Sequence, residues 1–191
     1  RIDVNDYYSQ REPNSSVLSY GVLNKITYPT GGYTRFVFEP HSYRKQLSMN
    51  RWEQCESLSA NKVAGGLRIK QIINSSSGNS QDEIVKKEYF YVTDYLVNGI
   101  NSKKSSGILG GRIQYGFSNY VVYAFNDRNV KRRMNVFSSQ SVLPACVNAQ
   151  SSHIGYSEVI ERNADGSFTQ LRFTNFDNGH LDEPADAIIQ E

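Results

Sequence analysis

The sequence is poor in the residues that most often build metal and redox centres. It holds two cysteines and three histidines in 191 residues. Cys55 and Cys146 are far apart with no CxxC pair, and His41, His153 and His180 lack an HxH or HExxH partner. We therefore predict no zinc site and no cofactor, and we interpret the histidines as ordinary surface or turn residues. The cysteines are either one disulfide or two separate buried or half-buried thiols.

Long apolar runs and catalytic signatures are also absent. No apolar run reaches the roughly 18 residues that a membrane helix needs, so this piece has no predicted transmembrane segment. A GxSxG elbow, a GxxxxGK[ST] loop and a strand-GxGxxG-helix unit are all missing, which disfavours serine hydrolysis and phosphate cradling. Glycoside cleavage would need two facing carboxylates, and the sequence alone brings no two of the candidates together. Those candidates, at expected strand ends or turns, are Glu39, Asp94, Glu158 and Asp182.

The chain carries little excess charge of either sign. The formal net charge is +2, and the basic residues are scattered along the chain, so a nucleic-acid partner is not expected. Lys131-Arg132-Arg133 is the one basic cluster, with Phe125 and Phe137 near it in sequence. Basic residues beside stacking aromatics can bind single-stranded nucleic acid, but we interpret these three as solvated loop residues.

The residues that are abundant predict a sheet. Aromatic residues make up 12% of the chain, mostly Tyr and Phe, and they suit half-buried strands joined by polar turns. The segment 21–39 is typical of a β-hairpin, because Pro29 fixes φ and Gly31 and Gly32 allow a left-handed conformation. In its second strand Thr34, Phe36 and Phe38 are expected on one face, opposite Tyr33, Arg35 and Val37.

The pattern along the rest of the chain predicts three regions. Residues 1–20 are an extended lead-in that breaks at Pro13, residues 21–176 are a single β-rich domain, and residues 177–191 are a loosely ordered acidic tail. A short apolar helical stripe is expected on Leu47, Trp52, Cys55 and Leu58. The further expected strands are 63–73, entered through Gly65 and Gly66, and 83–93, 107–116, 119–125, 154–162 and 167–176, the last pair joined by a turn at Asp165 and Gly166.

A weak internal repeat is present. Gly31-Gly-Tyr-Thr-Arg-Phe-Val-Phe38 aligns with Gly166-Ser-Phe-Thr-Gln-Leu-Arg-Phe173. Thr34, Phe36 and Phe38 then correspond to Thr169, Leu171 and Phe173, each set following a Gly-containing turn. The spacing is not regular enough to predict a solenoid.

These strings carry a resemblance to a family. The segments 23–39, Ala64-Gly-Gly-Leu-Arg-Ile-Lys70 and Ile154-Gly-Tyr-Ser-Glu-Val159 resemble the YD-repeat, Rhs-like segments of large bacterial surface or secreted proteins. The resemblance implies an extracytoplasmic segment of a longer protein and gives no catalytic residues. The start at Arg1 fits a mature product or an excised piece. The expected fold is mostly β, with antiparallel hairpins forming a sheet, a sandwich or a partial YD-like shell and little helix.

Two functions remain open at this point. The first is a structural or interaction module that contacts the remainder of its parent chain or a protein ligand. The alternative is a carbohydrate-binding or carbohydrate-active domain, in which Trp52, Tyr89 and Tyr91 would present aromatic faces to sugar rings. Cross-strand packing is the competing role for the tyrosines.

Overall fold

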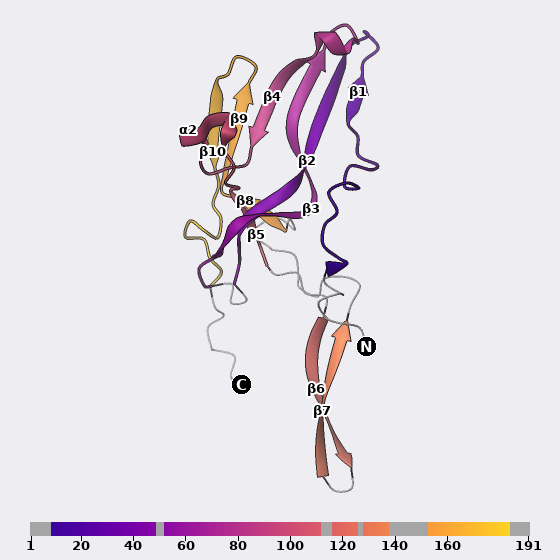
Figure 1. The fold of residues 1–191 in the computed structure, drawn as a ribbon, viewed down its shortest axis with the longest axis vertical. Helices are drawn as coiled ribbons and strands as arrows, with labels where there is room; N and C mark the ends of the chain where they lie inside the picture. The colour runs from indigo at the N-terminus through magenta and orange to yellow at the C-terminus, as the bar shows by residue number, and fades with distance from the viewer. Residues whose placement is uncertain (1–8, 49–51, 112–115, 126–127, 138–152, 184–191) are drawn as a thin grey trace.

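The chain folds into one mixed β-sheet and one separate two-stranded ribbon (Figure 1). The computed structural model describes residues 9–48, 52–111, 116–125, 128–137 and 153–183. Strands account for 52% of the structure and helices for 8%, which confirms the mostly β prediction. The sheet has the order β10-β9-β4-β3-β2-β5-β8, and β1 also pairs with β2. Its strands are β1 (Lys25–Thr27), β2 (Tyr33–Gln46), β3 (Glu56–Ser75), β4 (Ile84–Phe90), β5 (Gly107–Leu109), β8 (Ile154–Tyr156), β9 (Glu158–Asn163) and β10 (Phe168–Arg172).

The predicted hairpin at the start of the domain is confirmed. β1 and β2 are antiparallel, with Thr27 opposite Tyr33. Tyr28 N donates to Gly32 O at 2.8 Å, and Gly31 N donates to Tyr28 O at 3.0 Å. Gly31 has a φ of +94°. This is the three-residue hairpin loop in which a turn is followed by a left-handed residue.

The predicted hairpin of residues 154–162 and 167–176 closes in the same way. β9 and β10 are antiparallel. Asn163 N donates to Ser167 O at 2.8 Å, Gly166 N donates to Asn163 O at 3.0 Å, and Gly166 has a φ of +86°. The internal repeat therefore corresponds to two hairpins with the same loop, and β10 occupies the position in its hairpin that β2 occupies in the first.

The Gly65-Gly66 pair lies inside a strand, and the expectation that it opens one is wrong. Pro40 of β2 pairs with Leu67 of β3, whereas the next residue, His41, pairs with Ala64. Gly65 and Gly66 are thus extra residues on β3, which form a bulge. Gly66 has a φ of +86°, and a Cβ there would lie 3.1 Å from the His41 ring. A continuous strand of 20 residues results, because the bulge absorbs the mismatch.

The predicted helical stripe between residues 47 and 58 is also wrong. β2 continues to Gln46 and β3 begins at Glu56, and these two residues pair with each other. Leu47 is fully buried in a cluster with Ile108 and Phe176, against which Cys55 packs. Leu47 and, in part, Cys55 are buried by this one cluster, whereas Trp52 is 49% exposed, so no helical face is formed. Burial raises the pKa of the Cys55 thiol, and Cys146 lies outside the described residues.

The lead-in and the start of the 154–162 strand need further corrections. Residues 9–21 form successive turns instead of an extended segment, with Val17 N donating to Asn14 O and Tyr20 N to Val17 O. Ile154–Tyr156 does not continue into β9 but pairs with β5, which in turn lies parallel to β2. The parallel pairing of β5 with β2 makes the sheet mixed. Hairpins between consecutive strands, as the sequence predicts, would give only antiparallel neighbours.

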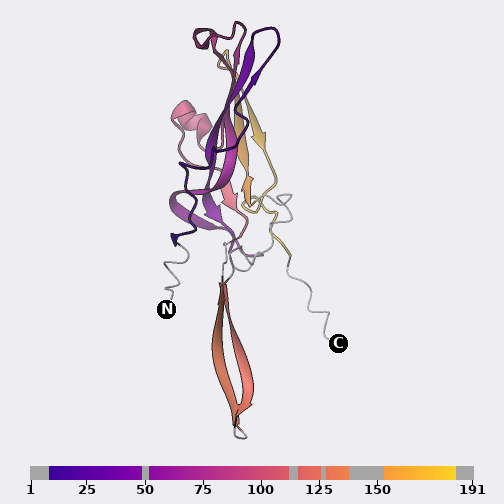
Figure 2. The same cartoon turned by 90° about the vertical axis from the view of Figure 1, so that its right-hand side faces the viewer.

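The segment around the basic cluster is a strand. β6 (Gly116–Phe125) and β7 (Arg128–Phe137) pair over their whole length, so the loop predicted for Lys131-Arg132-Arg133 is wrong. Lys131, Arg132 and Arg133 are exposed on this ribbon, because among the described elements β6 and β7 pair only with each other. The ribbon extends away from the eight-stranded sheet in both views (Figures 1 and 2). The stretch 138–152, expected to be linker-like, lies outside the described residues.

In the part of the chain that the structure describes, the named helical elements are single turns. These are η1 (Ser80–Asp82), α2 (Tyr95–Asn98) and η2 (Gly99–Asn101). Within the described ranges, no helix has the length and apolar character to span a membrane. The start of the predicted tail makes ordered contacts, since Asp177 forms an ion pair with Lys45 at 2.7 Å and Leu181 packs against the cluster of Leu47.

Candidate functional site

Arg68 is the centre of a half-buried polar cluster between β2, β3 and β8. Its side chain is only 11% exposed. Nε donates to Glu39 Oε1 at 2.8 Å, Nη1 to Tyr156 Oη at 2.7 Å and Nη2 to Ser42 Oγ at 3.2 Å. We call Glu39, His41, Ser42, Arg68, Tyr91 and Tyr156 the Arg68 cluster. A buried guanidinium needs such partners because desolvation without them is costly.

Two tyrosine rings enclose the guanidinium. Arg68 Cζ lies 4.2 Å from the ring centre of Tyr91 and 5.0 Å from that of Tyr156. The two rings are 4.8 Å apart, and Tyr91 Oη donates to the carbonyl of Ile69 at 2.8 Å. Burial raises the pKa of Tyr91 to about 12 and also raises the pKa of Tyr156. Both phenols are therefore neutral hydrogen-bonding groups at neutral pH.

His41 extends the cluster towards His153. His41 Nδ1 lies 2.8 Å from Tyr156 Oη, and its ring is 5.9 Å from the His153 ring. Burial, then the neighbouring His153 and Arg68, lower the pKa of His41 to about 4. His153 Nε2 donates to the carbonyl of Gly65 at 2.7 Å, which ties it to the β3 bulge. His41 is therefore half-buried and bonded within the cluster, unlike the surface histidine that the sequence predicts, whereas His153 and His180 are exposed as predicted.

A shallow groove of about 520 Å³ lies elsewhere, where β3 and β4 meet the β9–β10 loop. Asp165 accepts hydrogen bonds from Ser167 N at 2.9 Å and Ser167 Oγ at 2.6 Å, which lower its pKa. Asp82 accepts one from Ser77 Oγ. None of the lining residues is aromatic or belongs to the Arg68 cluster. They are Asn74, Ser76, Asp82, Ile84, Lys86, Asn163, Ala164 and Asp165.

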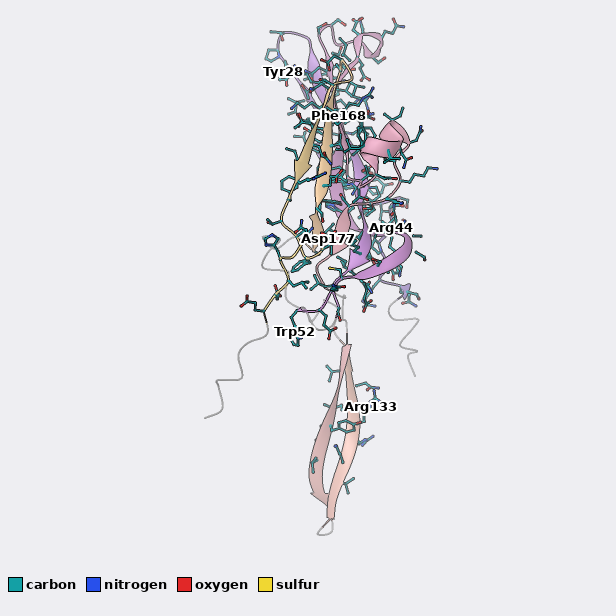
Figure 3. All side chains as sticks on the ribbon, turned by 90° about the vertical axis from the view of Figure 1, so that its left-hand side faces the viewer. Tyr28, Arg44, Trp52, Arg133, Phe168 and Asp177 are labelled. Atoms are coloured by element: carbon teal, nitrogen blue, oxygen red, sulfur yellow. The ribbon has the colours of Figure 1, made fainter. Side chains whose placement is uncertain are left out.

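The aromatic residues predicted to contact sugars do not converge. Trp52 is 49% exposed and lies at the end of the sheet that faces the ribbon, away from Tyr28 and Phe168 (Figure 3). Tyr91 is packed in the Arg68 cluster. Tyr89 is half-buried, and burial followed by the nearby Glu161 raises its pKa. None of the three lines the groove.

Two of the four predicted carboxylate candidates, Glu39 and Asp94, have hydrogen-bond partners that fix them in place. Glu39 binds Arg68, and Asp94 accepts hydrogen bonds from Asn98 Nδ2 at 2.9 Å and Lys104 N at 3.2 Å. Glu158 lies at the start of β9, and its Oε1 is a buried oxygen without a hydrogen-bond partner within the described structure. In the described ranges, no group of three or more His, Cys, Asp or Glu residues is arranged to hold a metal ion.

The β6–β7 ribbon presents apolar and cationic side chains together. Tyr120, Val122 and Met134 are 50–57% exposed. Tyr120 pairs with Arg133 and Val122 with Lys131, whereas Val121 pairs with Arg132 on the other face, since neighbouring residues of a strand alternate. Lys131 Nζ lies 4.3 Å from the Tyr120 ring centre. Both faces of the ribbon therefore carry a cation beside an apolar residue.

The ribbon also concentrates the positive charge of the chain. Residues 116–137 contain four basic residues and one acidic residue, a net charge of +3, whereas the whole chain carries +2. The remainder of the chain is therefore slightly acidic. The sequence shows the basic cluster, but the asymmetry of charge was missed because these residues were expected in a loop.

The sequence carries no signal for the Arg68 cluster, because Arg68 resembles any charged residue in an alternating strand.

Comparison with known proteins adds no relative. No protein-family model, curated protein or solved structure matches the chain.

Proposed function

We propose that the chain is an interaction module of a larger extracytoplasmic protein, with the sheet as scaffold and the β6–β7 ribbon as contact arm. The larger parent and the location rest on the resemblance to YD-repeat segments. The observation that carries the contact role is the exposure of Tyr120, Val122 and Met134 on a ribbon whose strands pair only with each other among the described elements. A lone two-stranded ribbon is at best marginally stable in water, so a partner that buries its apolar residues stabilises it.

The chemistry of the ribbon favours an acidic protein surface. Lys131, Arg132 and Arg133 attract carboxylates, and the side chains of Tyr120 and Val122 beside them need apolar contacts. A protein surface supplies both kinds of contact, whereas a phosphate backbone supplies only the first.

Amide hydrogen exchange tests the contact role. We expect the β6 and β7 amides to exchange at least about tenfold more slowly in the parent protein than in the isolated chain, because binding adds to local opening energy. Reversing Lys131, Arg132 and Arg133 to Glu should remove that protection. A matched triple reversal of the exposed scaffold residues Lys62, Lys70 and Lys103 should leave it intact. Equal exchange in parent and isolated chain contradicts the proposal.

A carbohydrate-binding role is the second candidate, and the groove is the observation that favours it. Asn74, Asn163, Asp82 and Asp165 offer hydrogen-bonding groups that suit sugar hydroxyls, without an aromatic stacking face. Titration with a panel of soluble oligosaccharides should shift the amide resonances of these four residues. Resonances that stay fixed across the panel would remove this candidate.

A further inference from the structure

The outer edge of β10 is the least guarded edge of the sheet. β10 ends the strand order, and no described strand pairs with its outer side. Natural edge strands are usually kept short or carry lysine, proline or a bulge, which prevents pairing with other chains. β1 and β8 have three residues each, and β1 contains Lys25. β10 has five residues, no proline or lysine, a regular register with β9, and a single charge at Arg172.

The backbone of β10 is oriented to accept another strand. The loop closes with the bond from Asn163 N to Ser167 O, and hydrogen-bonded positions alternate along an antiparallel pair. Thr169 and Leu171 therefore direct their N–H and C=O groups towards β9. Phe168, Gln170 and Arg172 direct theirs outwards.

The first hairpin shows what such an edge accepts. Its loop closes in the same way, so the residues of β2 that correspond to the outward set of β10 are Tyr33, Arg35 and Val37. Those three pair with Ser75, Ile73 and Gln71 of β3, respectively. An antiparallel strand occupies this edge in the first copy of the hairpin, whereas no described strand occupies the corresponding edge in the second.

Exposed apolar side chains border the open edge. The Phe168 ring packs edge-on against Tyr95 at 5.1 Å, which places the α2 turn beside β10, as Figure 1 also shows. The next residues, Leu96 and Val97, are 63% and 86% exposed, and Ile100 is 62% exposed. The α2 turn therefore leaves apolar residues exposed near the Phe168 end of the open ladder.

We propose that β10 pairs antiparallel with β10 of a second copy of this chain, about a two-fold axis through Gln170. In this register Gln170 faces Gln170 of the second copy, and Arg172 faces its Phe168. The register is self-complementary, because each cation meets an aromatic ring and no two like charges face each other. Leu171 faces Thr169 on the other side of the ladder. Since one five-residue strand buries little area, we expect a dimer that depends on concentration.

Analytical ultracentrifugation tests the proposal. Between about 1 and 500 μM the wild-type chain should pass from monomer to dimer. Gln170→Lys and Gln170→Glu each place like charges opposite each other on the axis and should weaken the dimer about tenfold or more. An equimolar mixture of the two variants should restore dimerisation, because Lys then faces Glu. The neutral control Gln170→Thr should dimerise like the wild type.

Several results would overturn the proposal. They are a wild-type monomer over the whole range, unweakened dimers of both charged variants, and a mixture that associates no better than either variant alone.

Hydrogen exchange of the wild type is a second measurement that needs no variant. The amides of Phe168, Gln170 and Arg172 should become protected as concentration rises, and unchanged exchange in a dimer would place the interface elsewhere. Charge reversal in the β6–β7 ribbon should leave the dimer intact, which separates this interface from the contact arm.

Discussion

At the scale of single residues, Arg68 has the largest expected effect on stability. Its guanidinium is bound to Glu39 and Tyr156 and lies between two rings, so its loss leaves buried polar groups without partners. Arg68→Met should lower the free energy of unfolding by about 2 to 4 kcal/mol, measured by urea denaturation. The matched control is Lys70→Met, two positions along the same strand and exposed, which should cost less than about 0.5 kcal/mol. Equal stability of the two variants would mean that the Arg68 cluster contributes no net stability.

His41 links the same cluster to pH. Its pKa is about 4 in the folded chain against an ordinary 6.5, because burial disfavours the imidazolium. Between these two values the unfolded chain binds a proton that folded His41 does not, so the free energy of unfolding should fall as pH drops from 6.5 towards 4. His41→Gln should reduce this loss by about 1 to 2 kcal/mol, because glutamine does not titrate. The exposed His180→Gln is the control, and identical pH profiles for the wild type and His41→Gln would contradict the assignment.

The burial of these residues was not predictable from the sequence. An alternating pattern places Arg68 and Tyr91 on faces of strands but does not say which face is covered or by what. Tyr156 reaches Arg68 only because β8 joins the sheet through β5, a contact between segments 88 residues apart. Tyr91 packs against Arg68 and Tyr156, which agrees with the packing role considered for the tyrosines and not with sugar stacking.

At the scale of elements, the residues of the turns were the best guide to the hairpins. Both hairpins with a Gly-containing loop are present, because a left-handed glycine fixes the loop and the alternating faces fix the strands. The sequence failed where long-range contacts decide. The bulge at Gly65-Gly66 resembled a strand start, and residues 47–58 resembled a helix because their few apolar residues fall at helical spacing. The pairing of β2 with β3 determines the structure of both segments, and that pairing cannot be seen in the local sequence pattern.

The hairpin glycines give a prediction at this scale. Gly31→Val should destabilise the fold by about 1 kcal/mol or more, because a β-branched residue is strained at its φ of +94°. Gly32→Val should cost more, since a Cβ there would lie 2.7 Å from the backbone carbonyl of Ser75 on β3. Gly65→Ala should be nearly neutral, because its Cβ would have no atom within 4 Å. The chemical denaturation midpoint should be lowest for Gly32→Val, intermediate for Gly31→Val and highest for Gly65→Ala. Unchanged midpoints for the valine variants would contradict the loop geometry.

At the scale of the whole molecule, the sheet and the ribbon differ in how they are stabilised. The sheet buries Leu47, Ile108 and Ile160, which are almost inaccessible to solvent. Among the described elements, the ribbon strands pair with no strand of the sheet. The apolar side chains described on the ribbon are largely exposed. Cooperative unfolding requires shared buried contacts, so the sheet should unfold as a unit that does not depend on the ribbon.

A pair of substitutions separates the two parts. Val121→Pro removes an N–H in the middle of β6 and should disrupt its pairing with β7, seen as faster amide exchange in both strands. The denaturation midpoint of the sheet should stay within the equivalent of about 0.5 kcal/mol. Ile160→Ala empties a fully buried position of β9 and should lower the stability of the sheet by about 2 to 4 kcal/mol, with little effect on exchange in the ribbon. A proline variant that lowers the sheet midpoint as far as Ile160→Ala would show that ribbon and sheet form one cooperative unit, in which case the ribbon would not be an independent contact arm.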